Sequence, residues 1–208
     1  GVFAQKGMVA AAHAEASNAG IEILKMGGNA IDAAVATHFA LAVVFPFAGN
    51  LGGGGFAVIR TKNGQAHTLD FREKAPLKAH RDMYLDKEGN VIQGLSLQGH
   101  LASGVPGSVD GMVEMHQKFG KLPWDKLLEP AIKLAENGVT LTDREALGLN
   151  NNMSVFKKVN GENLSYFVKP DGTKWIKGDI LIQKDLAETL KLIQSQKRAG
   201  FYEGKTAA

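Results

Sequence analysis

The chain has 208 residues, of which 44% are hydrophobic and 22% are charged, proportions that are typical of a folded globular protein and argue against wholesale disorder. It contains no cysteine, which excludes disulfide bonds, thiolate metal sites and a cysteine nucleophile. The 24 basic and 21 acidic residues leave a net charge of only +3, so charge gives no support for binding to nucleic acid or to a membrane surface.

The first predicted element is a helix over residues 13–26, which Gly27 and Gly28 end. Asn29 is a favourable N-cap for a second helix, and Asp32 suits the positive end of that helix's dipole. Apolar side chains surround this second helix on nearly all sides, so we expect it to be buried.

Residues 30–49 form the most apolar segment of the chain, but they are not predicted to cross a membrane. Asp32, His38 and Pro46 interrupt the segment, and the uninterrupted part is far shorter than the roughly 20 residues that a membrane-spanning helix needs. The first residues also lack the basic and apolar regions of a signal peptide. Either the protein is not exported or its signal lies upstream of Gly1.

A β-hairpin is predicted next, with strands over residues 56–61 and 65–71 and a turn at Asn63 and Gly64. Residues 78–104 are mixed in character and are predicted to be rich in loops, with a turn at residues 88–90.

Helices return in the second half of the chain, over residues 108–119, 124–137 and 184–198. Pro130 is expected to kink or split the second of these, and Thr142 with Glu145 forms a capping box that opens a further helix. The polar residues 150–163 are predicted to be a loop, and residues 180–182 a short strand. One hairpin flanked by helices predicts a mixed α/β fold whose sheet is incomplete in this chain.

The glycine run at residues 52–55 fits neither phosphate-loop pattern, because it leads into a strand and not into a helix. It is predicted to serve close backbone packing, or a positive φ angle at a bend. A direct role in substrate binding is the less favoured alternative.

Arg72 is the candidate binding residue. Strand alternation places Asp70 and Arg72 on one face and Leu69 and Phe71 on the other. An arginine at the end of a buried strand presents a rigid, planar set of donors to a carboxylate. Arg72 could therefore bind a substrate acid, or it could form an ion pair with Asp70, Glu73 or another internal carboxylate. The spacing alone favours the ion pair.

No other residue type gives a stronger signal. None of the six histidines has the spacing of a zinc-binding helix, so no metal site is predicted. His38, on its apolar helix, is expected to be a hydrogen-bonded core residue. Ser17, Ser103 and Ser108 lack the nucleophile-elbow pattern G-x-S-x-G.

Four segments together resemble the large subunit of the γ-glutamyltransferase family, also called γ-glutamyltranspeptidases or glutathione hydrolases. They are GGNAIDAAVATHFALAVVFPFAGNLGGGGF (27–56), DFREKAP (70–76), HLASGVPGSVDGM (100–112) and EPAIKLAENG (129–138). A weaker similarity continues through residues 178–185 and 200–204. The first segment is long and highly specific.

The resemblance implies an N-terminal-nucleophile hydrolase, with a four-layer αββα sandwich that this chain holds only in part. Residues 1–208 would be one incomplete domain, the N-terminal portion of the large subunit. A precursor of the family cuts itself, and the new N-terminal threonine of the small subunit becomes the nucleophile. That threonine would lie outside this chain, so the 208 residues alone are expected to be inactive.

The resemblance also implies the chemistry. Arg72 would bind the α-carboxylate of a γ-glutamyl group, and a threonine acyl-enzyme would pass that group from glutathione to water, an amino acid or a peptide. No metal or organic cofactor is implied, and the partner would be the protein's own small subunit. Family members in bacteria are usually periplasmic or extracellular.

Two alternatives stay open. The chain could belong to a glutaryl or cephalosporin acylase, or to a poly-γ-glutamate transferase, of the same superfamily; these need not require the carboxylate-binding arginine. It could instead be a non-catalytic fragment or a binding domain.

Overall fold

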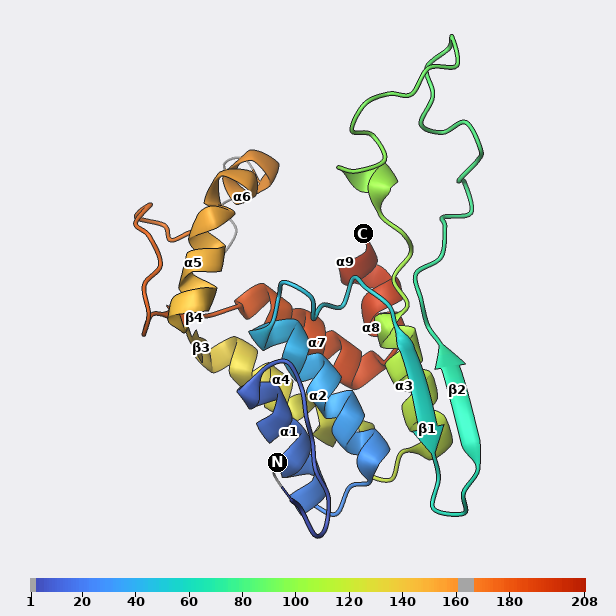
Figure 1. The fold of residues 1–208 in the computed structure, drawn as a ribbon, viewed down its shortest axis with the longest axis vertical. Helices are drawn as coiled ribbons and strands as arrows, with labels where there is room; N and C mark the ends of the chain where they lie inside the picture. Colours follow the sequence, from blue (N-terminus) through green and yellow to red (C-terminus); the bar gives the residue numbers. More distant parts are fainter. Residues whose placement is uncertain (1–2, 161–166) are drawn as a thin grey trace.

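The computed structural model describes residues 3–160 and 167–208. Its centre is a group of four packed helices, α1 (Ala14–Lys25), α2 (Ala30–Val44), α4 (Trp124–Asn137) and α7 (Lys184–Gln196). They pack in the order α1, α2, α4, α7 (Figure 1). α2 is buried along most of its length, with Phe39 fully inaccessible and its ring edge-to-face against Trp124 at 5.8 Å. The predicted burial of this helix is confirmed.

The start of α2 has the predicted cap. The Asn29 side chain accepts hydrogen bonds from the backbone N–H groups of Ile31 and Asp32, and the Asp32 carboxylate accepts one from the Asn29 N–H. Asp32 is fully buried, and it also accepts hydrogen bonds from the backbone of Lys121 and Leu122, at 2.9 to 3.2 Å. The cap therefore also fixes the start of α2 against the connection between α3 (Ser108–Phe119) and α4.

The hairpin consists of β1 (Phe56–Arg60) and β2 (Ala66–Asp70), which pair antiparallel with Phe56 opposite Asp70. It lies along α3 (Figure 1). Ala57 and Ile59 face the core, whereas Phe56 and Val58 are 66% and 84% exposed. The outer face of β1 thus presents apolar side chains without cover from the described residues.

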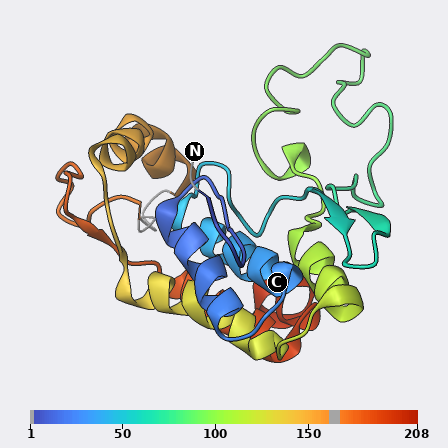
Figure 2. The ribbon, with the colours of Figure 1, turned by 60° about the horizontal axis from the view of Figure 1, so that its bottom comes forward.

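Residues 78–104 stand away from the helices in both views (Figures 1 and 2). Their only helical turn is η1 (His100–Ala102), and an isolated bridge joins Leu85 to Val91. The predicted turn at residues 88–90 is confirmed, with Gly89 at φ 85° and Asp86 accepting backbone hydrogen bonds. The predicted loop-rich character of this segment is correct.

A second, smaller core lies at the end of the packed helices away from the hairpin (Figure 2). It is built by α5 (Asp143–Asn151), α6 (Met153–Asn160) and the two-stranded pairing of β3 (Val139–Thr140) with β4 (Ile180–Leu181). The buried residues of this core are Leu141, Ala146, Leu149, Trp175 and Leu181.

The predicted loop over residues 150–163 is wrong where the structure describes it, because α5 reaches Asn151 and α6 follows. The polar side chains that suggested a loop include one that forms hydrogen bonds within the protein. Asn150 donates to and accepts from the backbone of Trp175, and Phe156 packs against the small core. Residues 161–163 of this prediction lie outside the described residues.

Pro130 does not split its helix, since α4 is continuous through it. Pro130 is itself buried, and the apolar packing of Leu127, Leu128 and Ala131 outweighs the missing backbone hydrogen bond. The strand at Ile180 is confirmed as β4. Two short helices at the end, α8 (Ala199–Tyr202) and α9 (Gly204–Ala207), were not predicted. No helix in residues 3–160 or 167–208 combines the length and apolar character that crossing a membrane requires.

Candidate functional site

Arg72 lies on a short extended segment that is paired on both sides. Phe71 exchanges backbone hydrogen bonds with Gly55, at 3.0 and 3.3 Å, which continues the hairpin past the end of β2. Lys74 exchanges two with Val105, at 2.7 and 3.2 Å. The backbone of Arg72 is therefore held between two fixed pairings, which leaves only its side chain to choose a direction.

Glycines let the neighbouring segments approach this backbone closely. A Cβ atom on Gly54 would lie 2.6 Å from the Phe71 oxygen and 2.8 Å from the Cα of Arg72, and one on Gly107 would overlap the same Phe71 oxygen. The Gly53 oxygen accepts hydrogen bonds from the backbone N–H groups of Gly107 and Ser108, at 2.9 and 3.0 Å. Three chain segments thus meet around one arginine.

The glycine run at residues 52–55 therefore serves close packing, as predicted. None of its four glycines has a positive φ, which removes the alternative of a left-handed bend. Gly107 and Gly111 were not singled out from the sequence. Gly111 is required because the Phe71 ring occupies the place of its Cβ. No local pattern shows this, since the two residues are distant in the sequence.

The side chain of Arg72 is exposed and uncommitted. Among the described residues, its guanidinium group takes part in no ion pair or hydrogen bond, and Asp70 accepts instead from the backbone N–H of Arg72, at 3.0 Å. The ion pair with Asp70 or Glu73 that the spacing favoured is therefore not formed here. A free planar guanidinium on a fixed backbone is suited to bind a carboxylate from outside the chain.

A hollow of about 840 Å³ lies between α2, β1 and α3, and Phe71 but not Arg72 lines it. His38 also lines it, and burial lowers the pKa of this histidine to about 4. Its Nε2 atom is buried and has no hydrogen-bond partner in the part of the chain that the structure describes. His38 is therefore half-buried with an enclosed Nε2 atom, and the expected hydrogen bond is missing at this atom.

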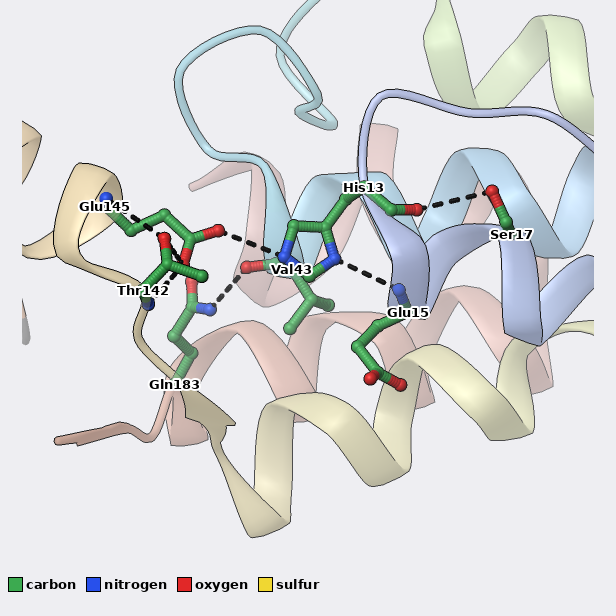
Figure 3. Close-up of polar contacts among 7 residues, drawn as sticks. All are labelled: His13, Glu15, Ser17, Val43, Thr142, Glu145 and Gln183. Carbon is green, nitrogen blue, oxygen red and sulfur yellow. Dashed lines mark hydrogen bonds and ion pairs between the residues drawn. The ribbon is translucent and has the colours of Figure 1, made fainter. Parts of the chain in front are cut away.

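A second polar cluster joins the small core to α1 and α2 (Figure 3). His13 accepts a hydrogen bond from the Glu15 N–H at Nδ1 and contacts Glu145 at 3.0 Å through Nε2, so it caps α1 and reaches α5. Burial raises the pKa of Glu145, but the hydrogen bonds from Thr142 and the contact with His13 outweigh it, and the net pKa is lowered. Gln183 donates to the Val43 oxygen at 2.8 Å.

This second cluster has a structural role, since its hydrogen bonds connect α1 to α5 and α2 to Gln183 (Figure 3). The sequence predicted the capping box of Thr142 and Glu145 but not its contact with His13. In residues 3–160 and 167–208, no three His, Asp or Glu side chains gather in a way that would hold a metal ion.

The sequence profile of the gamma-glutamyltranspeptidase family matches residues 16–208. The chain belongs to this family. It is 48% identical to a glutathione hydrolase proenzyme of Pseudomonas sp. (strain A14) over 99% of its own length, and it spans 36% of the length of that relative.

Solved structures of the gamma-glutamyltranspeptidase family and of an acylase share the fold. The gamma-glutamyltranspeptidase of Helicobacter pylori is 50% identical, with a TM-score of 0.93 over 99% of this chain and 59% of that one. A cephalosporin acylase of Bacillus halodurans is 30% identical, with a TM-score of 0.82 over 99% of this chain and 39% of that one. The predicted family and the predicted α+β fold class of these hydrolases are confirmed.

Proposed function

We propose that the protein of which these residues form a part transfers γ-glutamyl groups from glutathione and related compounds to water, amino acids or peptides. Membership of the gamma-glutamyltranspeptidase family supports this reaction, as does the name glutathione hydrolase proenzyme of the Pseudomonas relative. Because the chain spans about a third of that relative, the activity is assigned to the complete protein and not to residues 1–208 alone.

The single observation that carries the proposal is the free guanidinium of Arg72 on a rigidly held backbone. In a γ-glutamyl compound the reacting amide is at the side-chain end of glutamate, so the α-carboxylate is free. An ordinary peptide has no carboxylate at this position. Arg72 would bind that carboxylate through two parallel N–H···O hydrogen bonds, and lysine would be a poorer replacement because it lacks the planar pair of donors.

The remaining chemistry belongs to residues beyond this chain. A threonine at the N-terminus of a small subunit, released by self-cleavage of the precursor, would attack the γ-carbonyl carbon and expel the amine of cysteinylglycine. Backbone N–H groups would stabilise the tetrahedral oxyanion, and water or an amine would then release the γ-glutamyl group. Residues 1–208 would be the N-terminal portion of the large subunit.

The apolar outer face of β1 supports such a partner. Phe56 and Val58 are largely exposed, and the hollow beside His38 is lined by the same strand. We assign the cover of this face to the small subunit. We also propose a periplasmic or extracellular location for the complete protein, in line with the family.

A second candidate is an acylase acting on glutaryl or cephalosporin substrates, which the similarity to the Bacillus halodurans acylase favours. The two functions differ in whether the substrate must carry the α-carboxylate. We expect the complete protein to hydrolyse γ-glutamyl-p-nitroanilide with a kcat/KM at least about 100-fold above that for glutaryl-p-nitroanilide, which lacks both the amino and the α-carboxyl group. Equal values for the two anilides would support the acylase and contradict the proposal.

A further inference from the structure

The segment that holds Arg72 from one side is itself anchored from the far end of the chain. Tyr202, at the end of α8, donates a hydrogen bond from its hydroxyl to the Pro106 oxygen at 2.8 Å. The same hydroxyl accepts one from the backbone N–H of Asp110, at 3.2 Å. Burial raises the pKa of Tyr202, so the hydroxyl keeps the proton that it donates.

Arg198 adds a second connection to the same helix. It forms an ion pair with Asp110 and with Glu114, the latter at 3.0 Å, and it donates to the Gln117 side chain at 3.2 Å. Asp110 and Glu114 both belong to α3, the helix that Gly107 opens. Arg198 and Tyr202, which both follow α7 in the chain, thus fix the position of the first turns of α3.

The position of this segment affects Arg72 through contacts between backbone atoms. Pro106, which Tyr202 holds, directly precedes Gly107, and Gly107 packs against the Phe71 oxygen so tightly that a Cβ atom would not fit. On its other side, Gly107 donates to the Gly53 oxygen. A shift of Pro106 by a few tenths of an ångström must therefore move the backbone of Phe71 and Arg72 or break these contacts.

We propose that Tyr202 is a positioning residue for Arg72: through Pro106 and Gly107 it fixes the direction from which the guanidinium meets the substrate carboxylate. The inference rests on the proposed function of Arg72. Arg198 supports the same placement through α3. Loss of Tyr202 should therefore weaken the binding of substrates that carry the α-carboxylate. It should leave the rate of the reaction step unchanged.

The test is a double-mutant cycle in the complete protein, with kcat and KM measured for γ-glutamyl-p-nitroanilide and for glutaryl-p-nitroanilide. Tyr202→Phe should raise KM for the γ-glutamyl substrate about fivefold, with kcat unchanged, because it removes the hydroxyl's hydrogen bonds to Pro106 and from Asp110 and so loosens the placement of Arg72. It should leave kcat/KM for the glutaryl substrate unchanged. In an Arg72→Ala background, the same substitution should have no further effect on either substrate.

Tyr84→Phe is the matched control, because it also removes a tyrosine hydroxyl that donates to a backbone oxygen. Tyr84 donates to the Leu101 oxygen, at 2.9 Å, within residues 78–104. This variant should leave KM unchanged. Arg198→Met is a second variant that loosens α3 without removing the tyrosine, and it should also raise KM for the γ-glutamyl substrate alone.

Each outcome decides between the two proposals. If Arg72→Ala raises KM but Tyr202→Phe and Arg198→Met do not, the positioning role is wrong and the function of Arg72 stands. If Tyr202→Phe weakens both substrates equally, or acts equally in the Arg72→Ala background, the tyrosine has a general structural role and the inference is overturned. If Arg72→Ala leaves KM unchanged, the proposed function fails, and the inference fails with it.

Discussion

Gly54 lies against the backbone of Arg72, so that a Cβ atom at Gly54 would be 2.8 Å from the Cα of Arg72. The guanidinium is long and flexible, but its point of attachment is fixed by this contact and by the pairings at Phe71 and Lys74. A binding arginine thereby loses less conformational freedom when it meets its ligand. The geometry of the backbone, more than any contact of the side chain, makes this residue suitable for binding.

Gly54→Ala should therefore weaken substrate binding without touching the substrate. The added methyl group displaces Arg72, and we expect KM for a γ-glutamyl anilide to rise about tenfold in the complete protein. Gly52→Ala is the matched control, because the nearest atom to its Cβ would be Asn50 Oδ1, at 3.7 Å. Equal KM values for the two variants would show that the close approach at Gly54 does not position Arg72.

Asp32 is expected to contribute strongly to stability. Its buried carboxylate accepts hydrogen bonds from three backbone N–H groups, and an asparagine amide could replace only one of the two oxygens. Asp32→Asn should lower the free energy of unfolding by about 3 kcal/mol, measured by urea denaturation with tryptophan fluorescence. Asp143→Asn, at an 80% exposed side chain, should change it by less than about 0.5 kcal/mol. A loss of similar size in both variants would contradict this account.

His38 should make the folded chain sensitive to acid. Its pKa falls from 6.5 to about 4 on burial, so the unfolded chain binds a proton more readily than the folded one between these values. Stability from this residue is complete above about pH 6.5 and is lost as the pH falls toward 4, by about 3 kcal/mol in total.

Urea denaturation at about pH 7.5 and about pH 4.5 measures this loss. His38→Gln should lose about 2 to 3 kcal/mol less between the two pH values than the unmodified chain does. His80→Gln, at an exposed histidine, should behave like the unmodified chain. The assignment to His38 is wrong if its variant has the same pH dependence as the His80 variant.

The features that the sequence predicted well are local ones. The N-cap at Asn29 and the capping box of Thr142 with Glu145 depend on residues at most three positions apart, and the hairpin depends on one Asn-Gly turn. α6 was mistaken for a loop because its stability comes from Phe156 against a core assembled from residues 141–181. The sequence of residues 150–163 alone therefore could not predict this helix.

The residues around Arg72 also divide into those with a local sequence signal and those that depend on distant contacts. Arg72 could be singled out because it ends a strand and follows a pattern that resembles a known family. Gly107 and Tyr202 could not, because Gly107 acts on Phe71 and Tyr202 acts on Pro106, 96 residues away. The free state of the Arg72 guanidinium was also out of reach, since it depends on where Asp70 directs its carboxylate.

The most direct test of the central claim is the KM for glutathione of an Arg72→Ala variant of the complete protein, with Arg72→Lys beside it. We expect the alanine variant to raise KM at least about 30-fold, as expected for the loss of a charged pair of hydrogen bonds, and the lysine variant to recover only part of this loss. An unchanged KM for glutathione in the alanine variant would contradict the assignment of Arg72 as the residue that binds the substrate carboxylate.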